Sequence, residues 1–231
     1  MRGKRALSTR RRRALGWGIL LCAVLLANYF WGLYCVTPGH ALRHMAVRYG
    51  LPATEVWTAV NLPGVLDDAG EADEHYMLSY NDSCLLLSAV RFDLRKGWTA
   101  EPAALRQEHG EPVTLGQVSF CREIETGYET VYLFFGRVNA PDAAAVELAV
   151  RHSSLGEDEQ GARWEEFPWQ RARIPAGDFQ TVGGYRQFMA VLDPVYDPGG
   201  STFETYDLRL VREDGSAEDI PPESTYGFQR Y

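Results

Sequence analysis

Four adjacent arginines stand directly before a long uncharged segment near the start of this chain. Arg10 to Arg13 are followed by a mostly apolar run from residue 14 to residue 36 that holds no Asp, Glu, Lys or Arg. As a helix rising 1.5 Å per residue, such a run is about 33–35 Å long, enough to cross a bilayer core of about 30 Å. The sequence therefore predicts an N-terminal transmembrane helix over residues 14–36.

The basic residues also predict the direction of this helix. Lys and Arg beside a membrane span stay on the cytoplasmic side, so we expect residues 1–13 to form a basic cytoplasmic tail and the rest to be extracytoplasmic. A cleaved signal peptide is the alternative. The run exceeds the roughly 7–15 apolar residues of a signal, however, and ends in bulky side chains such as Trp31 and Tyr34. We therefore expect an uncleaved, single-pass signal-anchor in the plasma membrane.

Charge is divided sharply along the chain. Residues 1–36 contain seven of the 23 Lys and Arg residues and no acid, which leaves 16 basic against all 31 acidic residues in residues 37–231, a net charge of −15. A strongly acidic domain repels phosphate backbones, which excludes nucleic acid as an expected partner. The expected partners are the lipid bilayer, through residues 14–36, and an envelope protein or glycan.

Short strands dominate the pattern of the exported part. In residues 90–94 and 145–150, apolar side chains alternate with polar ones, the period of a strand with one buried face. In the first of these segments Phe92 and Leu94 are expected to face inward. Many such strands, separated by turn residues, predict a mainly β fold, with an antiparallel β-sandwich-like, immunoglobulin-like domain over residues 61–231.

The best hairpin signal lies between Val118 and Val138. Thr126-Gly127 supplies a turn between two strand-like runs, and Val131 to Phe135 is apolar at every position. A run that is apolar on both faces is typical of a strand covered on both sides. We therefore expect this strand to be a central one.

Residues 37–60 are predicted to form a helical juxtamembrane connector. Thr37-Pro38-Gly39 should end the transmembrane helix, and a short helix is expected from His40 to Tyr49. The segment from Leu51 to Val60 is ambiguous between a helical turn and a strand. Residues 99–110 are polar and contain a proline, and we expect one helical turn there.

Two cysteines, Cys84 and Cys121, fall in strand-like segments of the exported part. Outside the cytoplasm they could pair and close a loop of about 38 residues, which would stabilise the domain by ~3–4 kcal/mol in the chain-entropy model. The alternative is a pair of separate buried thiols. The sequence does not decide between them.

The sharpest enzyme alternative is a membrane-anchored cysteine transpeptidase of the sortase type. Its chemistry needs a thiolate, a nearby His and an Arg that steadies the oxyanion. The only available set is Cys121 with His75 or His109 and Arg122 or Arg137. The residues before Cys121 lack the Thr-rich approach of that family, so this alternative is not preferred.

Metal and sugar sites have weaker signals. His40 and His44 stand four residues apart on the expected helix without a third ligand. The acidic stretches 67–74 and 193–204 lack the register of an EF-type calcium loop. An exposed tryptophan beside acids would be a platform for a sugar ring; the candidates are Trp98, Trp164 and Trp169. We assign no catalytic, cofactor-binding or metal-ligating residue.

The sequence therefore predicts where the protein works more firmly than what it does. We expect a single-pass membrane-anchored protein whose extracytoplasmic β domain is a binding or scaffolding module in the cell envelope, and not an enzyme. The alternatives are the sortase-like transpeptidase and an accessory subunit of a membrane complex. The ligand, the partner and the oligomeric state are not readable from the residues.

Overall fold

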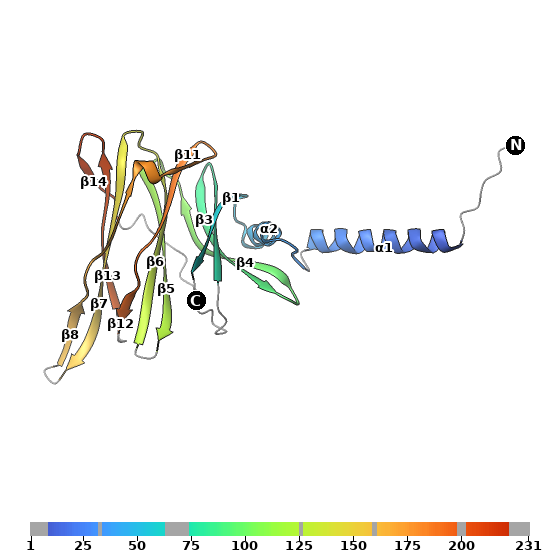
Figure 1. Ribbon diagram of the computed structural model, residues 1–231, viewed down its shortest axis with the longest axis horizontal. Coiled ribbons are helices and arrows are strands. Elements are labelled where there is room, and N and C mark those ends of the chain that lie inside the picture. Colours follow the sequence, from blue (N-terminus) through green and yellow to red (C-terminus); the bar gives the residue numbers. More distant parts are fainter. Residues whose placement is uncertain are drawn as a thin grey trace. The chain divides into compact units, whose positions relative to one another are not determined.

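The computed structural model describes residues 9–31, 34–62, 74–124, 127–158, 161–197 and 202–221 (Figure 1). Within these residues there are two α-helices and fourteen strands, and the strands form antiparallel sheets. The prediction of a mainly β chain is confirmed.

The chain divides into two compact units. The N-terminal unit consists of residues 1–51 and 90–101, and the β unit consists of residues 52–89 and 102–231. Two strands of one hairpin, β3 (Cys84–Asp93) and β4 (Gly97–Gln107), contribute residues to both units. Each unit is therefore described by itself.

Helix α1 (Thr9–Trp31) occupies most of the uncharged run in the N-terminal unit. Its large apolar side chains are at least half exposed from Leu15 to Leu26. Among the described residues, however, no helix has both the length and the sustained apolar character needed to cross a membrane. The helix at this position is present, but its predicted membrane-spanning role is not supported by the structure.

Helix α2 (Pro38–Tyr49) follows with a cap at each end. The Thr37 hydroxyl accepts a hydrogen bond from the backbone N–H of His40 at 3.2 Å, which satisfies a donor of the first turn. Gly50 ends the helix in the left-handed conformation, at φ 64°. The buried face of α2 includes Ala41, Leu42 and Met45, as the predicted helix requires.

Three sheets make up the strand structure. Sheet A has the order β1-β2-β3-β4, with β1 (Glu55–Leu62) and β2 (Glu74–Asn81). Sheet B contains β5 (Val113–Ile124), β6 (Gly127–Val138), β10 (Gln180–Val182), β11 (Tyr185–Val191) and β12 (Val195–Asp197). Sheet C contains β7 (Ala143–Asp158), β8 (Gly161–Glu166), β9 (Gln170–Pro175), β13 (Thr202–Arg212) and β14 (Ala217–Asp219). Figure 1 shows β7 and β13 side by side along most of their length.

Strand β6 lies between two hydrophobic cores. Tyr132 and Phe134 belong to a core shared with sheet C, whereas Leu133 and Phe135 belong to a second core shared with sheet A. All four side chains are fully buried. Because successive strand residues point to opposite faces, this alternation requires that sheet B be covered on both sides. The predicted central strand is confirmed.

Three segments differ from the sequence-based expectation. Residues 55–60 of the predicted helical connector belong to strand β1, which pairs with β2, because their β-branched and aromatic side chains favour a strand. Residues 97–107 form strand β4 rather than a helical turn, since Ala103 and Ala104 lie in the core between sheets A and B. Phe92 and Leu94 were expected to face inward but are 50% and 85% exposed. They stand at the tip of the β3–β4 hairpin, where the strands extend beyond the residues that form the core.

The close packing of sheet B predicts that Gly136 tolerates no side chain. A Cβ at this position would lie 2.7 Å from the Phe188 ring and 2.9 Å from the Thr114 carbonyl oxygen. We expect Gly136→Ala to lower the free energy of unfolding by about 1–3 kcal/mol because the surrounding side chains cannot all shift. The exposed Gly177, whose Cβ would meet no atom within 4 Å, gives the control variant Gly177→Ala. Equal denaturant midpoints for the two variants would contradict the prediction.

Candidate functional site

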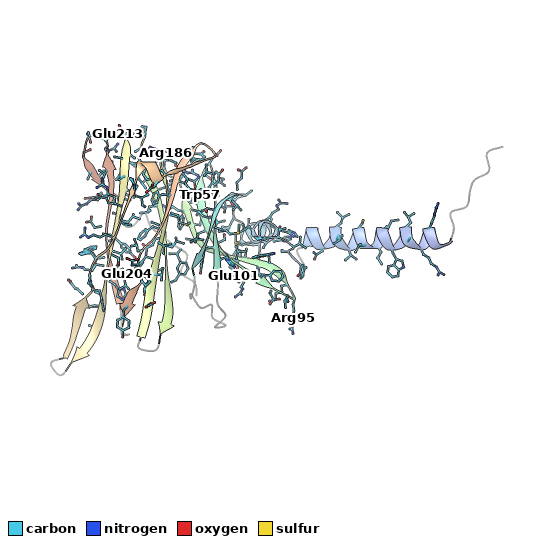
Figure 2. All side chains as sticks on the ribbon, in the orientation of Figure 1. Trp57, Arg95, Glu101, Arg186, Glu204 and Glu213 are labelled. Carbon is cyan, nitrogen blue, oxygen red and sulfur yellow. The ribbon has the colours of Figure 1, made fainter. Side chains whose placement is uncertain are left out.

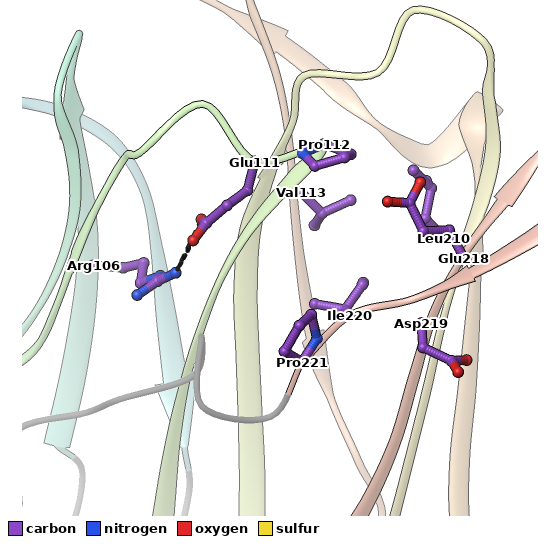
Figure 3. Close-up of a pocket in the computed structure, with 9 residues that line it drawn as sticks. All are labelled: Arg106, Glu111, Pro112, Val113, Leu210, Glu218, Asp219, Ile220 and Pro221. Carbon is purple, nitrogen blue, oxygen red and sulfur yellow. Dashed lines mark hydrogen bonds and ion pairs between the residues drawn. The ribbon is translucent and has the colours of Figure 1, made fainter.

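A pocket of about 480 Å³ opens on the side of the β unit (Figure 3). Its lining comes from the end of β4, the start of β5, and β13 and β14 with the two residues after β14: Arg106, residues 111–113, Leu210 and residues 218–221. The residues therefore come from all three sheets, although they are far apart in the sequence.

The floor of the pocket is apolar. Val113, Leu210 and Ile220 are buried members of the core between sheets B and C, and Pro112 and Pro221 extend this surface. The pocket therefore gives a ligand direct access to the edge of a hydrophobic core. An apolar side chain entering it would be removed from water, which favours binding by about 25 cal/mol per Å² of apolar surface.

Two strand edges border this pocket. Among the described strands, β5 pairs only with β6, and β14 pairs only with β13. An unpaired edge offers backbone N–H and C=O groups that an added strand can use. Strand β14 is only three residues long, and all three are exposed, whereas β5 is twelve residues long and presents the larger edge.

The rim of the pocket is acidic on balance. Arg106 donates from one guanidinium nitrogen to both carboxylate oxygens of Glu111, at 2.8 and 2.9 Å. On the opposite side Glu218 pairs with Arg212 at 2.6 Å, and Asp219 pairs with Arg209 at 3.3 Å. The same two arginines also pair with Asp142 and Asp207. Arg209, Arg212, Asp142 and Asp207 are not part of the pocket lining. Among the lining residues one arginine, Arg106, therefore stands against three carboxylates, and the rim favours a cation.

The Arg106 side chain is paired with Glu111, but one of its hydrogen-bond donors has no partner in the described structure. The side chain is 11% exposed, and its Nε atom is buried without a hydrogen-bond partner in the described structure. A buried donor without a partner costs about 1–3 kcal/mol relative to a satisfied one. A ligand carbonyl placed beside Arg106 would recover part of that free energy.

A second polar cluster ties sheet B to sheet C. The Glu204 carboxylate, labelled in Figure 2, accepts hydrogen bonds from the hydroxyls of Tyr132, at 2.9 Å, and Tyr206. Tyr132 is 3.2 Å from His152 Nδ1, and Gln117 Nε2 donates to Tyr206 at 2.7 Å. Each tyrosine donates its only proton to Glu204, so each must accept from its other neighbour, and His152 therefore carries its proton on Nδ1.

This cluster has a structural explanation. Five side chains from four strands exchange hydrogen bonds where the apolar core ends, and Tyr132 and His152 are buried. Burial, followed by the negative charge of Glu204, raises the pKa of the Tyr206 hydroxyl. The arrangement keeps Tyr206 protonated as a donor, and it links the two sheets more than it prepares a reaction.

The sequence-predicted cysteine site is not assembled around Arg137. Arg137 is fully buried, pairs with Glu108, donates to the Asn81 carbonyl at 2.7 Å and lies 3.8 Å from the centroid of the Tyr185 ring. Its cross-strand partner is Thr114, seven residues before Cys121 on β5, a separation of roughly 23 Å along the strand. Arg137 therefore cannot steady an oxyanion at Cys121.

The remaining members of that set are also dispersed. Cys121 lies on β5 opposite Thr130, and its side chain, like that of Arg122, is outside the described residues. His109 is exposed and precedes β5, at the end of the strand far from Cys121. His75 alternates on β2 with Tyr76, whose ring packs against Phe120, so His75 lies on the opposite face.

Cys84 is a buried free thiol, so the disulfide between Cys84 and Cys121 is not present. Burial raises the pKa of the Cys84 thiol, although the nearby Arg137 opposes this shift. A buried thiol of raised pKa is a poor nucleophile. The state of Cys84 therefore supports the alternative of two separate thiols.

The other sequence candidates form no site in the described residues. The rings of His40 and His44 are 4.9 Å apart, and no group of three or more metal-ligating side chains occurs in that part of the chain. The acidic stretches fall largely or partly on residues 63–73 and 198–201, outside the described residues. The centroid of the Trp169 ring is 5.1 Å from the guanidinium carbon of Arg151 and 5.6 Å from that of Arg171.

Sequence reasoning missed the pocket. Its residues carry no motif, and Arg106 stood in a segment, residues 99–110, that was expected to hold a helical turn, with Glu111 directly after it. The one available signal was Pro112-Val113 after a run of polar residues, which marks the start of a strand that follows a turn. Comparisons with protein-family models, curated proteins and solved structures find no match to this chain.

The tyrosine–glutamate cluster predicts a specific dependence of stability on alkaline pH. Because the folded-state pKa of Tyr206 is raised, protonated Tyr206 stabilises the folded protein below about pH 10, and this stabilisation is lost as the pH rises further. We expect Tyr206→Phe to lower stability at neutral pH by about 1–2 kcal/mol and to flatten the decline above about pH 10. Denaturant unfolding at a series of pH values measures both the stability at neutral pH and its decline at alkaline pH.

The exposed Tyr49 provides the control for the loss of one tyrosine hydroxyl. Tyr49→Phe should leave stability at neutral pH unchanged within about 0.5 kcal/mol. An alkaline decline in Tyr206→Phe as steep as that of the wild type would contradict the assigned role of the Tyr206 hydroxyl.

Proposed function

We propose that this protein is a membrane-anchored binding module whose pocket receives an extended, positively charged segment of an envelope partner. The observation that carries the proposal is the pocket itself: an apolar floor, an acidic rim and an open strand edge occur together. An apolar side chain of the partner would occupy the floor formed by Val113, Leu210 and Ile220. A neighbouring Lys or Arg of the partner would meet Glu218 and Asp219.

The β5 edge supports an extended partner rather than a helical one. A peptide that adds to a sheet edge gains backbone hydrogen bonds and places alternate side chains toward the same side. The start of β5, at Pro112 and Val113, lines the pocket. A strand added along β5 would therefore bring one side chain in two toward the pocket side.

We favour binding over catalysis because the described residues at the pocket include a paired Arg and carboxylates but no nucleophile beside a base. The sortase-like alternative depends on Cys121, which stands far along β5 from Arg137 and His109. The accessory-subunit alternative differs from our proposal only in where the partner resides.

The proposed anchor rests on the sequence. Residues 14–36 are uncharged, Arg10 to Arg13 precede them, and the apolar side chains of α1 are exposed. We propose that residues 1–13 are cytoplasmic and that the β unit lies outside the plasma membrane. An immunoglobulin-like arrangement of sheets B and C within that unit is part of the same proposal.

Binding to the pocket should depend on charge. The test uses full-length protein in nanodiscs and two fluorescent peptides that alternate Leu with Lys or Leu with Glu. We expect the Lys peptide alone to bind, with an affinity that falls as salt is added. Replacing both rim acids, in Glu218→Gln/Asp219→Asn, should weaken binding roughly five- to tenfold.

A matched control removes the same charge elsewhere. Glu147 and Glu166 are paired with arginines on the outward face of sheet C, away from the pocket. Glu147→Gln/Glu166→Gln should leave the peptide affinity unchanged. Equal weakening by both double variants, or equal binding of both peptides, would show that net charge rather than the pocket governs the interaction.

The proposed topology predicts the behaviour of a C-terminal reporter. Alkaline phosphatase fused after Tyr231 should be active, because that enzyme matures only outside the cytoplasm, and changing all of Arg10–Arg13 to Glu should reduce this activity severalfold. The control changes all of Arg10–Arg13 to Lys, which keeps the positive charge. Phosphatase activity that is absent from the wild-type fusion would refute the topology.

A further inference from the structure

The N-terminal unit has a charge opposite to that of the β unit. Residues 37–51 and 90–101 contain five of the 16 basic residues that follow residue 36 and two of the 31 acidic residues, a net charge of +3. The β unit carries the other 11 basic and 29 acidic residues, a net charge of −18. Solubility alone does not explain why the cations gather in the smaller unit.

The tip of the β3–β4 hairpin is bonded to the chain just after α1. The backbone N–H of Trp98 donates to the Cys35 carbonyl at 2.8 Å, and the N–H of Cys35 donates to the Lys96 carbonyl at 3.3 Å. Gly97, at φ 73°, permits this approach, because a Cβ there would collide with the Cys35 carbonyl and touch the Tyr34 ring. The hairpin tip is therefore held beside residue 35, next to the end of the uncharged run.

Two apolar side chains stand out on this tip. Leu94 is 85% exposed and Phe92 is half exposed, with its ring centroid 5.5 Å from that of Trp98. A single exposed leucine would be ordinary, but Leu94, Phe92 and Trp98 stand together at one hairpin tip, and such a grouping of apolar side chains favours a contact surface.

Exposed cations surround these apolar side chains. Arg91, Arg95 and Lys96 are all exposed, and Figure 2 labels Arg95 at the hairpin tip. The single acid of the tip, Asp93, accepts hydrogen bonds from the backbone N–H groups of Arg95 and Lys96 at 2.6 and 2.9 Å. These bonds lower the pKa of Asp93 and bind its carboxylate into the turn. With three cations and one acid, the tip has a net charge of +2.

We propose that the hairpin tip, residues 91–98, is a second membrane contact, in which Leu94 and Phe92 enter the bilayer interface and Arg91, Arg95 and Lys96 bind anionic phospholipid headgroups. This inference rests on the proposed anchor, because only an anchor ending near residue 36 brings residue 35 to the membrane surface. Apolar side chains flanked by cations bind anionic interfaces by burial and by charge together. The backbone hydrogen bonds between the hairpin tip and Cys35 hold the tip at the depth of the membrane surface.

The test measures depth in the bilayer with full-length protein in nanodiscs of neutral or anionic phospholipid. A spin-labelled amino acid is placed at residue 94, at residue 21 in α1, or at the exposed residue 191 of the β unit. Collisions with oxygen and with a water-soluble nickel complex then report the depth. We expect residue 21 to lie in the hydrocarbon, residue 94 at the interface and residue 191 in water.

The outcomes separate this proposal from the anchor on which it rests. A label at residue 21 in hydrocarbon combined with a label at residue 94 in water would overturn the hairpin contact and leave the anchor standing. A label at residue 21 in water would overturn both. Residue 94 at the interface, with residue 191 in water, supports the hairpin contact.

A charge reversal tests the headgroup part of the proposal. In anionic nanodiscs Arg95→Glu/Lys96→Glu should shift the label at residue 94 toward water, and the difference between neutral and anionic lipid should disappear. The matched control is Arg171→Glu/Arg173→Glu, which changes two exposed arginines of the β unit and should leave the depth unchanged. Retention of the lipid dependence in the first variant would overturn the role of these cations.

Discussion

Burial of strand β6 on both faces is the constraint on which the β unit depends. An antiparallel strand with a run such as Val131 to Phe135, apolar at every position, cannot leave either face of that run in water, so sheet B requires a layer on each side. Sheet C covers the face of Tyr132 and Phe134, and sheet A covers the face of Leu133 and Phe135. The glycines that face Phe135 and Phe188 follow from the same packing, since two aromatic rings lie where side chains would otherwise be.

Polar clusters complete each interface where the apolar cores end. Between sheets A and B, Arg137 pairs with Glu108 and binds the Asn81 carbonyl. Between sheets B and C, Glu204 accepts from two tyrosines. Buried polar groups are tolerated only when they are paired, and these pairings are directional, so they fix how the sheets align more strictly than apolar contact does.

Strand positions were largely predictable, and the site was not. Alternation and turn residues located the β5–β6 hairpin, the inward residues of β7 and helix α2, because these depend on neighbours in the sequence. Strand β4 was missed, because its alanines become core residues only when sheets A and B meet. The exposure of Phe92 and Leu94 was missed for a related reason: alternation shows which side chains share a face, and not whether that face is covered.

The sequence by itself determined the division of charge, the uncharged run after Arg13, the mainly β character and the two-sided strand, since each is a property of composition or of local period. The tertiary structure alone decided which edges stay open, which three segments form the pocket and where the hairpin tip meets Cys35. The physical reason is sequence separation. Residue 106 and residue 220 line one pocket only after three sheets have packed, and no local pattern encodes that arrangement.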